Sequence, residues 1–323
     1  MGFLTTDSDV EGDSAPRLSS GTVIAGRYRI AERIGQGGMA EVYKAFQPAL
    51  SRFVAIKMMR SGSPRDSRRF TIEAQTLARL RHPNAVAAHD YGIYEDDAGN
   101  GRPFIVMELV EGETLRDRIR REGSLAPDVV RHIAREVASC VKAAHDGGII
   151  HRDLKPTNIM LVKDSDPERP EVRVLDFGIA KLFAPRVSLT DEGELVGSPR
   201  YMAPEQFDED VSIDPRVDVW TLGILIYEMA SGDHPIRHKA KFSEVLSWLR
   251  EGPPEPPPAL PPDLAHTFSQ CLQRDPDERA QSMTEVLELL GARPGRPRWV
   301  GPVVVGAVAV AAAGVALAIA LSG

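Results

Sequence analysis

One stretch of the chain decides its fold, His151-Arg152-Asp153-Leu154-Lys155-Pro156-Thr157-Asn158, together with the downstream Asp176-Phe177-Gly178. Phosphoryl transfer needs hard oxygen donors for a metal, a group that orients the attacking hydroxyl, and cations for the developing charge. Asp176 and Asn158 can supply the donors, Asp153 the orienting group and Lys155 a cation. Each residue alone would equally well be a turn or surface residue. Their order and flanks together predict a phosphoryl-transfer site.

A glycine-rich turn lies upstream of this stretch. Residues 28–34 alternate apolar and polar side chains, break into Gly35-Gln36-Gly37-Gly38, and are followed by a second strand-like run at 41–45. This pattern predicts a hairpin with a glycine turn. Glycines at such a turn let backbone amides approach an anion, and a strand-turn-strand setting differs from the strand-turn-helix of dinucleotide folds.

Two charged residues follow the hairpin. Lys57 ends the run Val54-Ala55-Ile56-Lys57 within a third predicted strand at 53–59. Glu73 lies on a helix predicted at 67–81 from the spacing of its apolar residues. Lys57 is a candidate phosphate-binding cation and Glu73 a candidate partner for it. Without the rest of the site, an edge lysine and a solvated glutamate would be the simpler interpretation.

The downstream half has helical periodicity. Apolar spacing predicts a long helix from Val129 to Ala144, and residues 219–230 are apolar nearly all round, as in a buried central helix ended by Gly232. Ser282 and Glu285 predict a capping box for a last helix that Gly291 ends. The predicted fold is therefore α+β, strand-rich first and helical afterwards.

These motifs resemble the eukaryotic-type protein kinase family, from about Tyr28 to Leu290. The run Gly35-Gln36-Gly37-Gly38-Met39-Ala40-Glu41-Val42-Tyr43 is most similar to bacterial membrane-bound serine/threonine protein kinases. The resemblance implies a two-lobed protein kinase fold with a β-rich N-lobe at 28–110 and an α-helical C-lobe at 111–291. Residues 1–27 would form a disordered N-terminal tail.

The resemblance also implies site residues. The expected ATP-binding set is Ile34, Gly35, Gln36, Gly37, Gly38, Val42, Ala55, Lys57, Glu73, Met107, Glu108 and Val110. In this set Val42 and Ala55 would enclose the adenine, Met107 would be the gatekeeper, and the backbone of Glu108 and Val110 would bind the adenine edge.

Catalytic roles follow from the same resemblance. Lys57 would bind the α- and β-phosphates and pair with Glu73 in the active state. Asp153 would position the substrate hydroxyl and accept its proton, with Lys155 beside it. Asn158 and Asp176 would hold Mg²⁺ (or Mn²⁺).

The resemblance also bears on specificity and regulation, through the activation segment from Asp176 to Glu205 and the residues near it. Lys155 and the Gly197-Ser198-Pro199-Arg200-Tyr201 run resemble the serine/threonine branch and its substrate loop. Arg152 is expected to receive an activation-loop phosphate through charge-assisted hydrogen bonds. Thr190 is the first candidate phosphosite and Ser188 the second; the simpler interpretation is two loop hydroxyls.

Three further positions match the family and one departs from it. Glu205 in Ala203-Pro204-Glu205 is expected to pair with Arg279, and Asp218 is expected to brace the catalytic loop. Ala40 stands where a third glycine is usual, which would tune nucleotide affinity without abolishing activity.

The C-terminal residues predict a membrane anchor. Residues 292–298 form a basic linker with Arg293, Arg296 and Arg298, and the uncharged run 299–321 is long enough for a transmembrane helix. Arginines before the span and none after it predict a cytoplasmic kinase domain. Gly306 and Gly314 leave a homodimer open, although their spacing is not the i, i+4 pattern.

Composition narrows the remaining choices. A formal net charge of −7 gives no electrostatic reason to expect nucleic-acid binding, and protein substrates are the expected partners. The cysteines, Cys140 and Cys271, lie among apolar residues and are predicted to be buried free thiols. Two other functions stay open, a pseudokinase scaffold that binds nucleotide without turnover and a small-molecule phosphotransferase of related fold.

Overall fold

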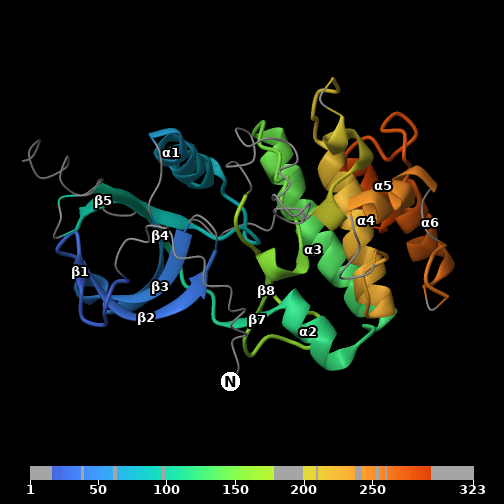
Figure 1. Ribbon diagram of the computed structural model, residues 1–323. Coiled ribbons are helices and arrows are strands. Elements are labelled where there is room, and N and C mark those ends of the chain that lie inside the picture. Colours follow the sequence, from blue (N-terminus) through green and yellow to red (C-terminus); the bar gives the residue numbers. More distant parts are fainter. Residues whose placement is uncertain are drawn as a thin grey trace, which may run out of the picture. The chain divides into compact units, whose positions relative to one another are not determined.

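Strands and helices segregate along the chain in the computed structural model (Figure 1). The structure describes residues 17–37, 40–60, 64–96, 99, 101–177, 199–208, 210–236, 242–251, 255–258 and 260–291. Residues up to Gly291 group into one unit, and residues 292–323 form a second unit that lies outside the described residues. The described part has the two predicted lobes, the strand-rich N-lobe at the left of Figure 1 and the helical C-lobe at the right.

The N-lobe is built on a six-stranded sheet with the strand order β1-β2-β3-β4-β6-β5 and antiparallel pairing throughout. Its strands are β1 (Val23–Ile24), β2 (Tyr28–Gln36), β3 (Ala40–Gln47), β4 (Arg52–Met59), β5 (Ala88–Glu95) and β6 (Gly101–Glu108). The predicted hairpin is confirmed as β2 and β3. β1 and β5 were not predicted, because β1 has only two residues and β5 has exposed apolar side chains at Tyr91 and Ile93.

Helix α1 (Pro64–Arg79) packs on β5 and β6 of this sheet. The sequence places this helix at 67–81, so the start and the end differ. Proline is well accommodated in the first turn of a helix, which lets the element begin at Pro64. Pro83 disfavours helical backbone in the residue before it, so the helix ends ahead of His82. Phe70 and Leu77 are buried on the face predicted to be apolar.

The C-lobe is a helical layer around one buried helix. Its helices are α2 (Leu115–Glu122), α3 (Pro127–Asp146), α4 (Arg216–Ser231), α5 (Phe242–Glu251), α6 (Pro262–Cys271) and α7 (Met283–Leu289). α4 is buried nearly all round and is capped by Gly232 in the left-handed region, as predicted. It approaches α6 closely, since a Cβ on Gly223 would lie 2.8 Å from the Leu272 side chain.

A small sheet in the C-lobe corrects the purely helical prediction. It pairs β7 (Gly112–Thr114), β8 (Ile159–Val162) and β9 (Val172–Val174) in the order β7-β8-β9. Strands of three or four residues are too short to give a periodic sequence signal. β8 and β9 join the two halves of the deciding sequence stretch and hold them side by side.

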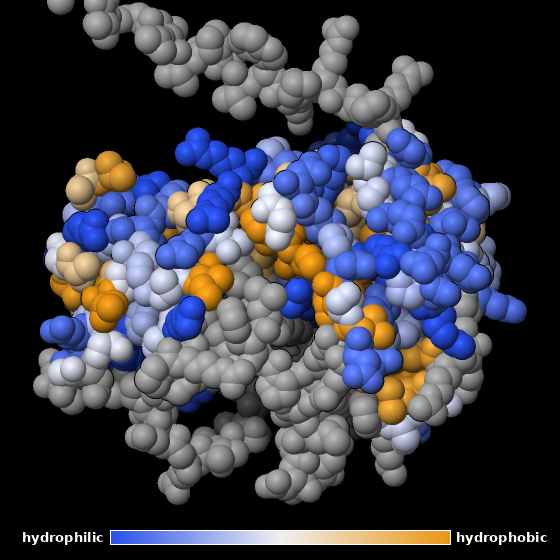
Figure 2. All heavy atoms as spheres, turned by 90° about the horizontal axis from the view of Figure 1, so that it is seen from above, coloured by the Kyte–Doolittle hydropathy of each residue, from blue (hydrophilic) through white to orange (hydrophobic). Residues whose placement is uncertain are grey.

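Apolar residues gather inside the two lobes. The view from above in Figure 2 shows hydrophilic side chains over most of the described face, with hydrophobic ones in separate small groups. Cys140 and Cys271 are buried and unbonded, as predicted, and burial raises the pKa of each thiol to about 12. Among the described residues, no helix has the length and apolarity needed to cross a membrane. The predicted span 299–321 lies outside those residues and stays a prediction.

Candidate active site

The centre of the site is a buried lysine between two carboxylates. Lys57 on β4 lies with its Nζ atom 2.7 Å from Glu73 Oε1 on α1 and 2.9 Å from Asp176 Oδ1. Burial acts against the lysine charge, but the carboxylates of Asp176 and Glu73 outweigh burial and raise the pKa of Lys57 above its usual range. The predicted Lys57–Glu73 pair is therefore present within the N-lobe. Asp176, which follows β9, adds a C-lobe carboxylate to this cluster.

A second cluster surrounds Asp153. Lys155 Nζ lies 2.8 Å from Asp153 Oδ2, and Asn158 Nδ2 donates to the Asp153 carbonyl oxygen at 2.8 Å and to Asp153 Oδ2 at 3.2 Å. A 3₁₀ turn at Pro156–Asn158 folds the chain back, so residues five positions apart in the sequence can meet. The carboxylate is thus fixed by an amide on one side and an ammonium on the other.

Asp218 holds the backbone of the loop that carries Asp153. Its carboxylate accepts the backbone N–H of His151 at 2.7 Å and of Arg152 at 2.8 Å, and it contacts His145 Nε2 at 2.7 Å. Arg152 adopts a positive φ of 62°, a conformation that costs a non-glycine residue about 1–2 kcal/mol. The two hydrogen bonds from the fully buried Asp218 stabilise that conformation. The predicted bracing role is confirmed.

The two sequence motifs contact each other directly. The buried His151 ring packs on the Phe177 ring with centroids 4.5 Å apart, and His151 Nε2 lies 3.1 Å from the Leu175 carbonyl oxygen. Burial lowers the pKa of His151, so the imidazole is neutral at pH 7. This packing sets the backbone on either side of Asp176 relative to Asp153. His151 lies in the motif that predicts the site, but the sequence pattern alone assigns it no role.

The expected nucleotide-binding residues line up across the N-lobe strands. Val42 on β3 is opposite Lys57 on β4, and Ala55 on β4 is opposite Met107 on β6. Ile34, Gly35 and Gln36 lie on β2, and Gly37 donates its N–H to the Ala40 carbonyl at 2.8 Å to close the turn. Gly38 lies outside the described residues.

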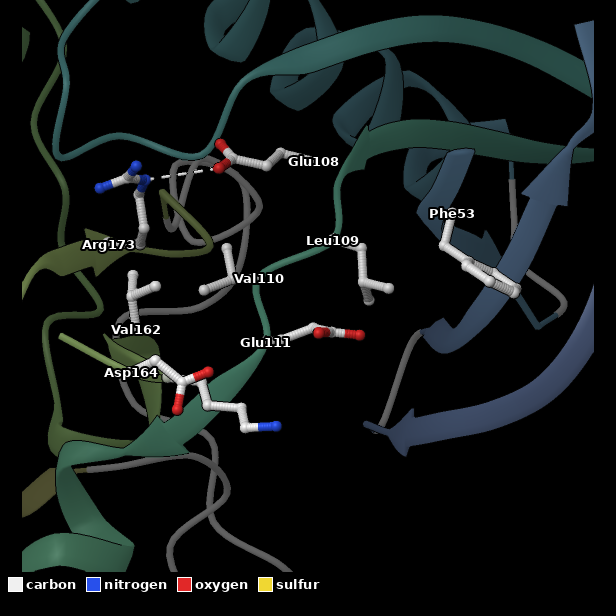
Figure 3. A pocket seen from close by; sticks show the side chains of 9 residues that line it. Phe53, Glu108, Leu109, Val110, Glu111, Val162, Asp164 and Arg173 are labelled. Carbon is white, nitrogen blue, oxygen red and sulfur yellow. Dashed lines mark ion pairs between the residues drawn. The ribbon is translucent and has the colours of Figure 1, made fainter. Parts of the chain in front are cut away.

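A cavity of about 370 Å³ lies at the segment that joins the lobes after β6. In Figure 3 this segment carries Leu109, Val110 and Glu111 between Phe53 on one side and Asp164 on the other. The lining consists of Phe53, Glu108, Leu109, Val110, Glu111, Val162, Lys163, Asp164 and Arg173. Of the expected adenine contacts, Glu108 and Val110 belong to this lining, whereas Val42, Ala55 and Met107 do not. The lining also lacks Lys57, Asp153 and Asp176. The cavity is therefore separate from the catalytic cluster.

The structure bears on the expected adenine contact of the Glu108 backbone, but the expected phosphosites lie outside the described residues. The Glu108 N–H already donates to the Ala87 carbonyl oxygen at 2.9 Å. The candidate phosphosites Thr190 and Ser188, and Ser198 of the expected substrate loop, lie outside the described residues.

A metal would have to be held by few protein ligands. Among the described residues there is no group of three or more His, Cys, Asp or Glu side chains placed to hold one. Asn158 and Asp176 offer amide and carboxylate oxygens, which suit Mg²⁺ bound by one or two protein ligands together with substrate phosphates. The donor set fits a metal that arrives with a nucleotide.

The predicted Glu205–Arg279 pair is present in the C-lobe. Arg279 Nη1 lies 2.7 Å from Glu205 Oε1, and Nη2 lies 3.0 Å from Glu205 Oε2. Arg279 is almost fully buried, so this bidentate pair is a fixed part of the lobe.

A further buried cluster was missed by sequence reasoning. Glu228 on α4 is 1% exposed, accepts the Tyr201 hydroxyl at 2.8 Å, and lies 3.0 Å from Arg116 Nη1 on α2. A single carboxylate in the otherwise apolar run 219–230 is a signal of a buried pair, and it could have identified Glu228. Nothing in the sequence points to Arg116 as its partner.

A family model described as "Protein kinase domain" matches residues 28–289. The chain belongs to the protein kinase domain family. Serine/threonine-protein kinase PknB of Mycobacterium leprae (strain TN) is 36% identical over 281 residues, covering 85% of this chain and 44% of PknB. Serine/threonine-protein kinase PknA of Mycobacterium tuberculosis is 33% identical over 297 residues, covering 89% of this chain and 67% of PknA. This kinase chain spans less than half the length of the PknB relative.

Solved structures of similar proteins agree with this assignment. A crystal structure of Rad53 1-466 in complex with AMP-PNP matches with a TM-score of 0.66 and 29% identity, covering 83% of this chain and 66% of that one. The Mycobacterium tuberculosis PknI kinase domain matches with a TM-score of 0.64 and 26% identity, covering 85% of this chain and 99% of that one.

Proposed function

We propose that this chain is a serine/threonine protein kinase that transfers the γ-phosphate of ATP to serine or threonine residues of protein substrates. The observation that carries the proposal is a pair of charged clusters, Lys57 with Glu73 and Asp176, and Asp153 with Lys155 and Asn158. Relatives that are 33–37% identical are named serine/threonine-protein kinases, which supports the hydroxyl class of the substrate.

In the proposed mechanism each residue acts through the geometry already described. Asp153 accepts the proton of the substrate hydroxyl, and the contacts from Lys155 and Asn158 keep its carboxylate in one orientation. Lys155, 2.8 Å from that carboxylate, offers positive charge to the phosphoryl group as negative charge develops on it. Lys57 holds the nucleotide phosphates, and Glu73 holds Lys57 in place.

Asn158 and Asp176 are the residues proposed to hold the Mg²⁺ or Mn²⁺ ion that accompanies ATP. The metal neutralises charge on the phosphates when it is bound. Asp176 is tied by one oxygen to Lys57, and 41% of its side chain is exposed, so its carboxylate can still coordinate a metal ion.

Autophosphorylation of the activation segment is the proposed regulation. Thr190 is the first candidate site and Ser188 the second. Arg152 precedes Asp153 and is held by Asp218, so a phosphate drawn to Arg152 would act directly on the catalytic loop. Mass spectrometry of the active protein that finds both residues unmodified would contradict this proposal.

We also propose that residues 299–321 anchor the kinase in a membrane, with the kinase domain in the cytoplasm. The apolar run and the arginines of the 292–298 linker support this. Helix pairing in the membrane would make a homodimer, and cross-linking of the full chain in vesicles tests it.

A pseudokinase scaffold is the alternative function. Loss of Lys57, Asp153 or Asp176 would favour it, and the chain keeps all three. No specific observation favours that alternative or a small-molecule phosphotransferase.

Incubation of the chain with labelled ATP and Mg²⁺, with and without a generic protein substrate, tests the proposed function. We expect label on protein, and we expect Asp153→Asn to lower the rate by about 10²–10⁴-fold through loss of the proton acceptor. Asp146→Asn is the matched control, since Asp146 is 64% exposed on α3 and outside the site. Nucleotide binding without label in any condition would favour the scaffold.

A further inference from the structure

The proposed mechanism leaves one buried carboxylate of the N-lobe unused, that of Glu41. It follows the glycine turn on β3 and is 3% exposed. Its Oε2 atom accepts the Tyr43 hydroxyl at 2.6 Å, and its Oε1 atom accepts a hydrogen bond from Arg33 Nη1 at 3.1 Å. Arg102 Nη2 lies 3.7 Å from Oε2. A buried charge persists only when other groups compensate for it, so these neighbours hold Glu41 in one place.

Glu41 lies on one side of the N-lobe sheet, and the Lys57 cluster lies on the other. Alternate residues of a strand face opposite sides. On β3, Val42 packs in the apolar cluster that contains residues of α1, whereas Tyr43 packs in the second apolar cluster of the lobe. Val42 is directly opposite Lys57, and the Tyr43 hydrogen bond puts the Glu41 carboxylate on the Tyr43 side. The carboxylate therefore acts on a nucleotide held by Lys57 only through the backbone of the turn.

The base of the glycine turn is tied to Glu41 from both strands. Gln36 on β2 is opposite Glu41 on β3, and the two strands lie side by side in the N-lobe (Figure 1). Arg33 Nη1 donates to Gln36 Oε1 at 2.7 Å as well as to the Glu41 carboxylate. Next to this pair, the Gly37 N–H donates to the Ala40 carbonyl oxygen at 2.8 Å. One guanidinium thus joins the last residue of β2 to the carboxylate that follows the turn.

An N-terminal segment, residues 17–22, reaches the same cluster; we call it the strap. Its Leu18 N–H donates to the Tyr43 hydroxyl oxygen at 3.3 Å, and the Leu18 side chain packs against the apolar cluster that contains Tyr43. Ile30 on β2 exchanges two backbone hydrogen bonds with the strap, of 2.8 and 2.9 Å. The strap is therefore a structured part of the N-lobe that contacts the Tyr43 phenol.

The Tyr43 phenol connects the strap to the carboxylate. Its oxygen accepts from Leu18 and its O–H donates to Glu41, so the two hydrogen bonds form a chain in which each polarises the next. Burial and the hydrogen bond to Glu41 raise the pKa of Tyr43, so the phenol stays protonated and remains a donor. Removal of the Leu18 contact therefore weakens the hold of Tyr43 on Glu41.

We propose that Glu41 is a positioning residue for the glycine turn, and that the strap raises nucleotide affinity through Tyr43 and Glu41. The contacts run from the strap through these two residues to Arg33 and Gln36, and they keep the base of the turn in one conformation. A turn already held in its binding conformation loses less freedom when the nucleotide binds. This inference rests on the proposed function for the nucleotide at the turn, and adds control of that site by the N-terminal segment.

Nucleotide binding tests the proposal separately from turnover. The Kd of a fluorescent, non-hydrolysable ATP analogue is measured for the full chain with Mg²⁺. For Tyr43→Phe we expect the Kd to rise about fivefold, which is part of what one hydrogen bond to a charged group contributes. We expect kcat at saturating ATP to stay within about twofold of the wild type, because the cluster around Asp153 is unchanged.

Tyr28→Phe is the matched control. Tyr28 is buried in the same apolar cluster as Tyr43, and its hydroxyl donates to Asp90 Oδ2 at 2.9 Å, so this variant also loses one hydrogen bond to a carboxylate. Tyr28 begins β2, at the end of the strand remote from the turn. We expect the urea midpoint to fall as in Tyr43→Phe, but the Kd to stay at the wild-type value. A purely structural role of Tyr43 would give the two variants the same Kd.

The strap is tested by Leu18→Ala, which removes the side chain that anchors it. We expect this variant alone to raise the Kd by about threefold, less than loss of the phenol does. In the Tyr43→Phe background we expect no further rise, since the strap acts through the phenol and coupled residues are not additive. Val23→Ala, at an exposed apolar residue that follows the strap, should bind the analogue as the wild type does.

An unchanged Kd in Tyr43→Phe, or a Leu18→Ala effect that adds in full to that of Tyr43→Phe, would overturn the proposal. If Tyr43→Phe does not fold, Arg33→Met decides the question, because it breaks the link between Glu41 and Gln36. The Arg33 side chain is 32% exposed, so we expect this variant to fold and to bind the analogue more weakly. An unchanged Kd in Arg33→Met would again contradict the proposal.

The outcomes separate this inference from the proposed function. If the wild type binds the analogue but never phosphorylates a protein, the proposed function fails, while the Kd ratios still decide the role of Glu41. If the wild type binds no nucleotide, both fail.

Discussion

Two buried ion pairs of this chain, Arg279–Glu205 and Lys57–Glu73, each join a cation to a glutamate. They differ in how many donors of the cation have acceptors. All five N–H donors of the Arg279 guanidinium have acceptors: both Glu205 oxygens and the carbonyl oxygens of Arg216, Gln273 and Arg274. The Trp220 ring lies 5.2 Å below the guanidinium. Arg279 has nothing left to offer a ligand.

The Lys57 pair is incomplete by comparison. An ammonium has three donors, and within the described residues two of them point to Glu73 and Asp176. Asp176 is 41% exposed, and the side chain of Lys57 is 14% exposed. A saturated pair stabilises a lobe, whereas an unsaturated pair that is partly exposed can bind phosphate. The difference lies in the number of acceptors around each cation, which the sequence does not state.

Arg279→Met breaks the saturated pair and should have the largest effect on stability. It leaves Glu205, 8% exposed, without its cation, and we expect the free energy of unfolding to fall by about 3–5 kcal/mol. Urea denaturation measures the change. The double variant Arg279→Met with Glu205→Gln should recover part of it, because no charge is then left unpaired. A loss below about 1 kcal/mol would contradict a structural role for this pair.

Lys57→Met breaks the unsaturated pair and should act on catalysis. We expect kcat/KM for protein phosphorylation to fall by about 10²–10³-fold, the usual loss for one electrostatic contact to a reacting group. The urea midpoint should change less than in Arg279→Met. Lys142→Met, on the surface of α3, is the matched control and should keep full activity. A destabilisation as large as that of Arg279→Met would remove the distinction between the two pairs.

Glu73→Gln separates the charge of the partner from its hydrogen bond. The amide oxygen still accepts from Lys57 but no longer holds it electrostatically, so we expect kcat/KM to fall by about tenfold, the difference between a charged and a neutral hydrogen bond. Steady-state kinetics at varied ATP concentration measure the loss. Glu32→Gln, on the exposed side of β2, should change nothing. Wild-type kinetics in Glu73→Gln would show that Asp176 alone positions Lys57.

His234 extends the comparison to a buried neutral group. Burial among Tyr201 and Arg200 lowers its pKa to about 3 in the folded state, below the ordinary value near 6.5 in the unfolded chain. The unfolded state therefore takes up a proton first as pH falls. The stabilisation is complete above about pH 6.5 and is lost progressively toward pH 3, by at most about 1.4 kcal/mol per pH unit.

Urea denaturation between pH 7 and pH 4 checks this prediction. His234→Asn keeps an acceptor for the Ile236 N–H, which donates to His234 Nδ1 at 2.9 Å, but cannot titrate in this range. We expect the variant to lose less stability on acidification than the wild type. Equal slopes in the two proteins would show that other groups control the acid sensitivity.

The predicted and the missed parts of the fold differ in length and in the range of their contacts. α4 was predicted nearly to its ends, because a run that is apolar all round and a following glycine are local signals. The sheet of β7, β8 and β9 was missed, because its strands are held by partners far along the chain and not by their own periodicity.

The candidate site divides in the same way. Lys57, Glu73, Asp153, Asn158 and Asp176 could be named because each lies in a motif whose chemistry is legible from residue type and order. The structure then supplied their distances. Arg116 and Glu228 could not be paired, since the two residues come from helices that are separate in sequence and neither lies in a motif.

The sequence by itself determined the class of chemistry, the lobes and the identity of the charged residues. Those properties depend on residue type, order and local periodicity, which are written along the chain. Only the tertiary structure decided which charges are saturated, which stay partly exposed, and which are balanced internally, as Glu228 is by Arg116. Saturation and burial depend on what other segments bring to each charge, and packing across the whole domain sets that.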